Sequence, residues 1–162
     1  MPVTDITKDV ENRTLTITAE FTAPVERVWG LYEDPRQLER VWGPPEFPAT
    51  FVNHQLRPGS RSTYFMSSPE GEKFAGYWDI TGVESPSRFT FDDGFAHEDF
   101  TPDTDLPVSQ NVYAFVASSS GTRAVFTSTY ASADALQRVL DMGMEEGARS
   151  AINQIDAFLA RG

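Results

Sequence analysis

The C-terminal part of the chain carries its clearest hydrophobic pattern. Between Ala133 and Ala160, apolar or small side chains recur every three or four residues, which is typical of a helix with one buried face. The pattern predicts a single unbroken amphipathic helix. The residues on its apolar side are Leu136, Val139, Leu140, Gly143, Met144, Gly147, Ala148, Ala151, Ile152, Ile155, Phe158 and Leu159.

Two of these positions, Gly143 and Gly147, are glycines. A glycine inside a helix costs ~1 kcal/mol relative to alanine, so two on a buried face need a physical reason. One reason is a close approach of the helix to the surface it packs on. The other is space for a ligand between the two surfaces, and the pattern leaves both open.

The N-terminal part predicts one strand followed by two short helices. Residues 1–12 are polar and mixed in charge, and we expect a flexible leader there. Apolar and polar residues alternate from Leu15 to Phe21, which predicts a strand. Pro24 can open a helix because its missing N–H is not needed at that position. Asp34, with Gln37 three residues later, predicts a second helix start.

The middle of the chain predicts strands separated by turns. With the first strand, about six or seven antiparallel strands result, followed by the long helix. Asp92–Gly94 is expected to be a turn and Phe95–Pro107 an irregular loop. This order indicates one α+β domain over residues 13–162, with helices on one face of the sheet. The six expected strands are Thr50–Leu56, Ser60–Met66, Lys73–Val83, Arg88–Phe91, Asn111–Ala117 and Arg123–Tyr130.

Composition narrows the function classes. The 162 residues carry a formal net charge of −11, which disfavours nucleic acid and anionic membranes as partners. The chain has no cysteine, so disulfides and thiolate chemistry are excluded. No segment approaches the ~20 apolar residues that span a bilayer, and the N-terminus does not resemble a signal peptide. We therefore expect a cytoplasmic protein.

Several short sequence motifs, taken in their order along the chain, resemble the family of the activator of heat-shock protein 90 ATPase in its bacterial single-domain form. That family lies within the START-like, or helix-grip, superfamily. The matching motifs are Phe21–Trp29, Val41–Pro44, Arg57–Ser60, Phe74–Tyr77, Gly121–Arg123 and Met142–Gly147. The resemblance implies a curved antiparallel sheet gripping the C-terminal helix, with a cavity between them. In related proteins the cavity binds apolar small molecules or carries chemistry on them. The eukaryotic namesake binds the chaperone and also uses an additional N-terminal domain.

Aromatic side chains are the main candidates for lining such a cavity. Strand alternation places many of them on shared faces, where they would serve as core or as pocket walls. The short helices around Trp29 and Trp42, with the loop Phe95–Pro107, are candidate lids. The expected ligand-binding residues are Trp29, Trp42, Tyr64, Met66, Trp78, Phe89, Phe91, Tyr113, Phe115, Phe126, Leu140, Gly143, Met144 and Gly147.

Other residue types indicate little chemistry. His54 lies within a predicted strand, and the sequence identifies no partner that would make it a general base. The acidic run around His97, beside Asp92–Asp93, has no recognisable ligand spacing and predicts a solvated loop rather than a metal site. Serines 118–120 predict a turn. We expect no catalytic residue, metal or cofactor.

Three functions remain open. The leading one is an intracellular binding protein for an apolar or amphipathic small molecule. A chaperone-associated interaction protein is the first alternative. An enzyme of the cyclase or hydrolase kind is the second, and it would require ionisable groups with shifted pKa values in the cavity. Arginines 27, 36 and 40 could form a basic rim for an acidic ligand. A homodimer is compatible with an exposed sheet edge.

Overall fold

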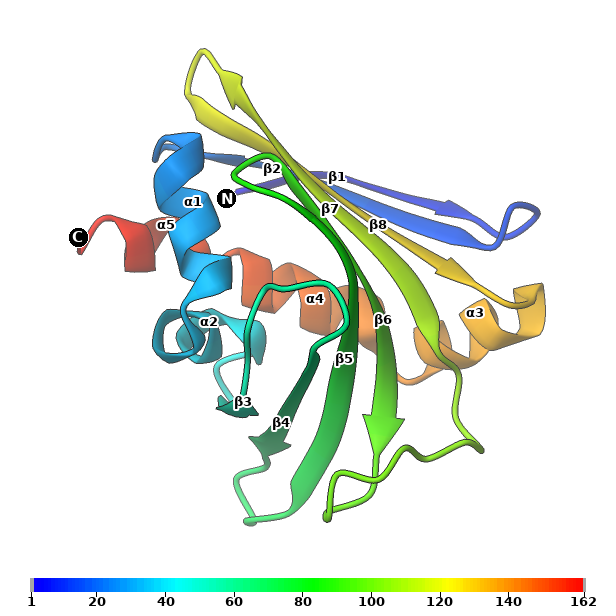
Figure 1. Ribbon diagram of the computed structural model, residues 1–162. Coiled ribbons are helices and arrows are strands. Elements are labelled where there is room, and N and C mark those ends of the chain that lie inside the picture. Colours follow the sequence, from blue (N-terminus) through cyan, green and yellow to red (C-terminus); the bar gives the residue numbers. More distant parts are fainter. Residues whose placement is uncertain (1, 162) are drawn as a thin grey trace.

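The computed structural model describes residues 2–161 as one antiparallel eight-stranded sheet with helices on its concave side (Figure 1). The strand order is β1-β2-β8-β7-β6-β5-β4-β3. The α+β architecture agrees with the sequence-based prediction, although eight strands form where six or seven were expected. The strands are β1 (Val3–Asp9), β2 (Thr14–Phe21), β3 (Ala49–Asn53), β4 (Arg61–Ser67), β5 (Lys73–Glu84), β6 (Arg88–Ala96), β7 (Ser109–Ser118) and β8 (Gly121–Tyr130). The helices are α1 (Val25–Glu33), α2 (Pro35–Trp42), α3 (Ala133–Asp141), α4 (Met144–Ile152) and α5 (Ile155–Leu159).

The additional strand is β1, within the segment expected to be a flexible leader. It pairs antiparallel with β2, from Val3 opposite Ala19 to Asp9 opposite Thr14. Most of its side chains are exposed, and Val3 and Ile6 pack against the core. An edge strand needs only backbone pairing on one side, so β1 forms without the alternation that marks a half-buried strand.

The two short helices begin where the sequence predicts. Helix α1 follows Pro24, and α2 begins at Pro35 with Asp34 as its N-cap. The Asp34 carboxylate accepts a hydrogen bond from the Arg36 backbone N–H at 2.9 Å and another from the Gln37 side-chain amide at 3.1 Å. Both bonds stabilise the charged carboxylate and lower the pKa of Asp34.

The C-terminal helix is interrupted, contrary to the prediction of one continuous helix. The chain breaks between α3 and α4 at Gly143, whose φ of 86° and ψ of 19° are left-handed. A second break separates α4 from α5 at Asn153 and Gln154. A Cβ atom at Gly143 would have no atom within 4 Å, and the residue is exposed. Gly143 therefore serves the turn that ends α3, because glycine adopts a left-handed conformation at little cost.

Strand β6 is longer than expected and replaces the predicted turn at Asp92–Gly94. It continues to Ala96, with Asp93 opposite Trp78 on β5 and opposite Ser109 on β7. The irregular segment after it is held to α3, because the Arg138 guanidinium donates to the Asp105 carbonyl at 3.0 Å. Pairing on both sides outweighs the local turn preference of the Asp-Asp-Gly run.

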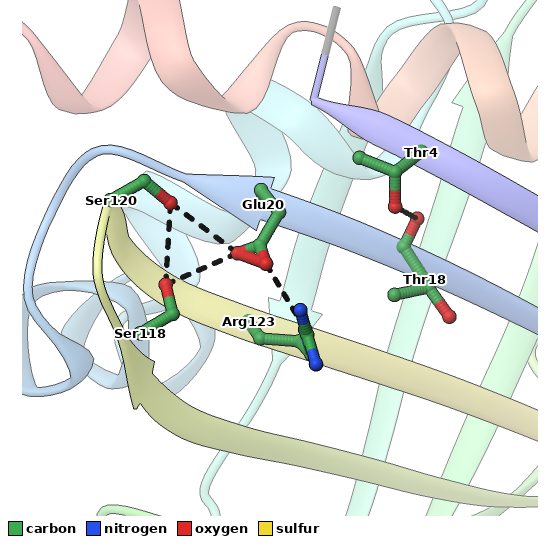
Figure 2. Close-up of polar contacts among 6 residues, drawn as sticks. All are labelled: Thr4, Thr18, Glu20, Ser118, Ser120 and Arg123. Atoms are coloured by element: carbon green, nitrogen blue, oxygen red, sulfur yellow. Dashed lines mark hydrogen bonds and ion pairs between the residues drawn. The ribbon is translucent and has the colours of Figure 1, made fainter.

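The serine run forms the predicted turn, at the end of the β7–β8 hairpin. Figure 2 shows the Ser118 and Ser120 hydroxyls directed at the carboxylate of Glu20 on β2, at 3.2 and 3.5 Å. The Arg123 guanidinium donates to the same carboxylate at 3.0 Å. These contacts tie the hairpin to β2, so we assign the serines a structural role.

Candidate functional site

The concave face of the sheet carries a continuous cluster of aromatic rings. Trp78 stacks on Phe91 with ring centroids 4.2 Å apart, and Trp42 from α2 meets Trp78 edge-on at 4.9 Å. The structure thus brings together the aromatic residues singled out from the sequence, because alternate residues of neighbouring strands share a face. The members that the sequence analysis named are Trp29, Trp42, Tyr64, Trp78, Phe89, Phe91, Tyr113, Phe115 and Phe126.

One part of this face, the sealed half, is closed by α1. Trp29 packs edge-on against Phe89 at 5.8 Å and Phe115 at 6.3 Å, and Tyr32 stacks on Phe115 at 5.5 Å. These four side chains are at most 4% exposed. Trp29 is therefore part of the core rather than of a lid. Its indole N–H has no hydrogen-bond partner among residues 2–161, which costs about 1–3 kcal/mol.

The other part, the open half, faces α3 and α4. Several inward-facing side chains here are only partly buried, namely Trp42, Met66, Leu140 and Met144. Tyr113 is also partly buried but lies at the edge of the sealed half, 5.7 Å from the Tyr32 ring. Helix α4 has α2 and α3 as its main neighbours, while α3 packs against β8. A Cβ atom at Gly147 would meet only Pro44, at 3.9 Å, an ordinary contact. Gly147 therefore does not mark a tight helix-to-sheet contact.

An acidic side chain lies on the inner face of this open half. Asp93 alternates with Phe91 and Phe95 on β6 and accepts a hydrogen bond from the Tyr64 hydroxyl at 3.1 Å. Burial raises the pKa of Asp93 to about 7, and the Tyr64 bond opposes that shift. Burial also raises the pKa values of Tyr64 and Tyr113 well above their ordinary range. The pair therefore joins a carboxyl that titrates near neutral pH to a hydroxyl that stays protonated.

Gly76 leaves room for this pair. It lies opposite Tyr64 on β5, and a Cβ atom there would come within 2.5 Å of the Tyr64 hydroxyl oxygen and 2.6 Å of its ring. Any larger residue at position 76 would displace the ring, because such separations are far below van der Waals contact. The glycine thus allows the Tyr64 side chain to lie across β5 and reach Asp93.

The buried amide and hydroxyl groups of β7 and β8 beside Asp93 bond one another, whereas the indole N–H of Trp78, opposite Asp93, has no partner within residues 2–161. The Asn111 amide donates to the Ser109 hydroxyl at 3.0 Å, and the Ser128 hydroxyl donates to the Asn111 carbonyl oxygen at 2.6 Å. Within residues 2–161, Asp93 accepts a side-chain hydrogen bond from Tyr64 alone. One carboxyl oxygen therefore remains available for a further donor.

His54 has a structural role. Its Nε2 lies 2.7 Å from the Tyr32 carbonyl, which can only accept, so Nε2 carries the proton. Its Nδ1 then accepts from the Ser62 hydroxyl, also at 2.7 Å. Burial lowers the pKa of His54 and favours this neutral form. The ring joins the end of α1 to β4, and both of its nitrogens are used.

Two hollows lie on the other side of the sheet. One, of about 400 Å³, surrounds the irregular pairing at Gly82, and the other, of about 340 Å³, lies between Thr81, Thr90 and Gln110. Thr90 and Gln110 alternate along their strands with the inward side chains of Phe91 and Asn111, which places the hollows on the convex face. Neither hollow is at the sheet–helix position expected for a cavity. Over residues 2–161, no group of three or more histidine or acidic side chains could hold a metal ion.

The three arginines of the short helices engage the protein itself. The guanidinium groups of Arg27 and Arg40 lie over the Phe158 ring, at 5.8 and 5.9 Å from its centroid. Arg36 donates to the Phe51 carbonyl and pairs with Glu39 at 3.5 Å. These contacts do not favour a basic rim for an acidic ligand.

A curved antiparallel sheet with helices across its concave face defines the START-like class of proteins. Residues 22–160 match the model of the family described as Activator of Hsp90 ATPase homolog 1-like protein. The chain therefore belongs to that family, as the sequence resemblance indicates. No helix within the described range is both long and apolar enough to cross a membrane.

Solved structures of bacterial proteins share the fold over nearly the whole chain. A Mycobacterium smegmatis protein is 66% identical, with a TM-score of 0.91 and coverage of 98% of this chain and 97% of that one. An Arthrobacter aurescens protein is 45% identical, with a TM-score of 0.92 and coverage of 98% and 92%. A Staphylococcus epidermidis protein at 24% identity, with a TM-score of 0.84 and coverage of 98% and 94%, shares the fold. No curated protein matches the chain.

Asp93 is the site residue that sequence reasoning missed. The run Asp92-Asp93-Gly94 was interpreted as a turn, which removed Asp93 from the strand pattern. The signal was nevertheless present, because Phe89, Phe91, Asp93 and Phe95 alternate over one continuous face. A polar residue at an inward position of such a pattern indicates a functional or hydrogen-bonded group.

Proposed function

We propose that this protein binds an apolar or amphipathic small molecule, inside the cell, between the open half of the sheet and α4. The main support is the contrast in burial along one face. Side chains under α1 are sealed, whereas Met66 and Met144 face inward and keep part of their surface accessible. Inward apolar groups with residual exposure are where a ligand would gain most from burial, at ~25 cal/mol per Å².

Access for the ligand would come from movement of α4. The helix is bounded by the left-handed Gly143 and by the turn at Asn153 and Gln154. Short helices between two breaks can shift as units, since the φ/ψ change is absorbed at their ends. The aromatic faces of Trp42 and Tyr64 would then form one wall and Met144 the other.

Native mass spectrometry of protein purified gently from its own cell tests this proposal. We expect an adduct of a few hundred daltons that is lost on denaturation. Met144→Trp should fill the site and abolish the adduct, whereas Met142→Trp, at a position 53% exposed on the same segment, should retain it. A bare mass for the wild-type protein would contradict ligand binding. The same spectrum reports whether the protein is a homodimer.

The Asp93–Tyr64 pair supports a second candidate, an enzyme on the same scaffold. A carboxyl with a pKa of about 7 can both accept and donate a proton near neutral pH. The identified ligand, supplied in excess, would be followed by mass spectrometry. A mass change with wild type that disappears with Asp93→Asn would indicate catalysis, and an unchanged mass would indicate a carrier.

The family description also keeps a chaperone-associated role as an alternative. Its test is the ATPase rate of the host's own Hsp90-type chaperone with and without this protein. A rate that does not change would remove this role. An increase that persists in Met144→Trp would place the chaperone contact outside the open half.

A further inference from the structure

Within residues 2–161, the Asp93 carboxyl has no ion-pair partner. The ion pairs there lie elsewhere, and those of α4 join Glu145 to Lys8 at 2.9 Å and Arg149 to Glu145 at 3.5 Å and Glu146 at 3.4 Å. The ionisable side chain in direct contact with Asp93 is Tyr64, whose hydroxyl donates to the carboxylate at 3.1 Å. A buried carboxyl without a cation takes up a proton, as the raised pKa of Asp93 allows, or stays ionised beside a positive charge supplied from outside the chain.

Aromatic residues flank Asp93 on the neighbouring strands. Trp78 lies directly opposite Asp93 on β5, and the Tyr64 hydroxyl reaches its carboxylate from β4. Trp42 extends the cluster from α2, 5.8 Å from the Tyr64 ring. A carboxylate among electron-rich aromatic rings is complementary to an ammonium group, which gains a charge-assisted hydrogen bond and cation–π attraction together.

The carboxyl is held in place, and Asp93 as a residue keeps part of its surface exposed. The Tyr64 hydroxyl holds one carboxyl oxygen, and Gly76 leaves the space for that ring. Asp93 is half-buried, in contrast to its neighbours Trp78 and Phe91, which are at most 1% exposed. The carboxyl therefore lies where the sealed aromatic cluster gives way to the open half.

We propose that Asp93, oriented by Tyr64, is the polar anchor of the ligand site and selects molecules that carry a protonated amine on an apolar body. This inference rests on the proposed binding function and names its ligand class. An amine supplies the missing positive charge, and its apolar body lies along Met66 and Met144. An acidic ligand would place two negative charges together in a poorly solvated site.

Three probes with the same chain test the anchor, namely dodecylamine, dodecanol and dodecanoate. Each is titrated below its aggregation threshold by calorimetry at about pH 8, where the carboxyl is ionised. We expect dodecylamine to bind at least about tenfold more tightly than dodecanol, and dodecanoate to bind most weakly. Asp93→Asn should remove the preference for dodecylamine over dodecanol. Its dissociation constant for dodecanol should stay within about threefold of the wild-type value.

Asp92→Asn is the matched control, since it removes the same charge from the adjacent position on the opposite face of β6. It should preserve the amine preference. Tyr64→Phe should reduce that preference without reversing it, because it removes only the orienting hydrogen bond. Thermal unfolding of each variant shows that it is folded before titration.

The outcomes separate the two proposals. If dodecanol and dodecylamine bind equally, or if Asp93→Asn leaves the amine preference intact, Asp93 is not the polar anchor. The proposed ligand-binding function is still supported in that case. Tightest binding by dodecanoate would also overturn the anchor. If none of the probes binds wild type, the proposed binding function fails, and the anchor fails with it.

Discussion

The two halves of the concave face use the same kinds of residue and differ in what covers them. Under α1, the rings of Phe89 and Phe115 are sealed to 1% exposure or less. Away from α1, Met66 comes from an equivalent inward position and remains half-buried. The contrast teaches that aromatic residues on a sheet face become core or candidate site according to the helix above them, and strand alternation alone does not distinguish the two.

The largest predicted effect compares truncations in the two halves. Phe89→Ala should lower the free energy of unfolding by about 3–5 kcal/mol, because it leaves a cavity among rings that cannot collapse. Met144→Ala should cost about 1 kcal/mol, since its side chain is already partly solvated. Urea unfolding measures both. Equal costs would contradict the division of the face into a sealed and an open half.

Asp93→Asn should stabilise the protein at alkaline pH. The pKa of this carboxyl is about 7 in the folded protein and 3.8 ordinarily, so the folded state binds the extra proton between these values. Stability linked to Asp93 is therefore complete below about pH 4 and lost as pH rises through 7. The variant should gain at most about 4 kcal/mol at pH 8, from ~1.4 kcal/mol per pKa unit across this shift.

Urea unfolding of wild type and Asp93→Asn from about pH 4 to 8 measures this difference. Asp92→Asn serves as the control, and its stability should follow wild type more closely across the range. A difference between Asp93→Asn and wild type that does not depend on pH would contradict the assignment.

His54 should act on stability in the opposite direction. Burial lowers its pKa in the folded state, so the unfolded chain binds the proton more readily. Its contribution is present above the unfolded pKa of about 6.5 and is lost as pH falls below that value. The Asp93→Asn background should make this loss easier to measure, because the opposing titration is removed. His54→Gln in that background should flatten the dependence, and an unchanged slope would assign it to another group.

The smallest predicted effect concerns the break before α4. Gly143→Ala should cost about 1–2 kcal/mol, because a left-handed conformation is unfavourable for a residue with a Cβ atom. Gly147→Ala, in a helical segment where a Cβ atom meets only Pro44 at 3.9 Å, should be neutral or stabilising. Thermal unfolding of both variants tests whether the glycines serve different purposes. Equal shifts would contradict that distinction.

Much of the fold was predictable because it depends on local chemistry. Pro24 and the cap at Asp34 begin the two short helices, and period-two alternation brings the aromatic rings onto one face. The failures have two physical causes. Strand β1 and the extension of β6 through Asp93 depend on pairing with distant parts of the chain, whereas the break at Gly143 is a local left-handed turn that the apolar periodicity does not register.

The sequence by itself determined the class of this protein, since the order of strands and helices, their caps and their short motifs are local properties. Only the tertiary structure decided which half of the aromatic face is sealed and which acid faces inward. Those properties depend on where α1 and α4 lie over the sheet, and on the cross-strand neighbours that surround Asp93. Burial and the pKa shift that follows from it arise from these long-range contacts, which no local pattern records.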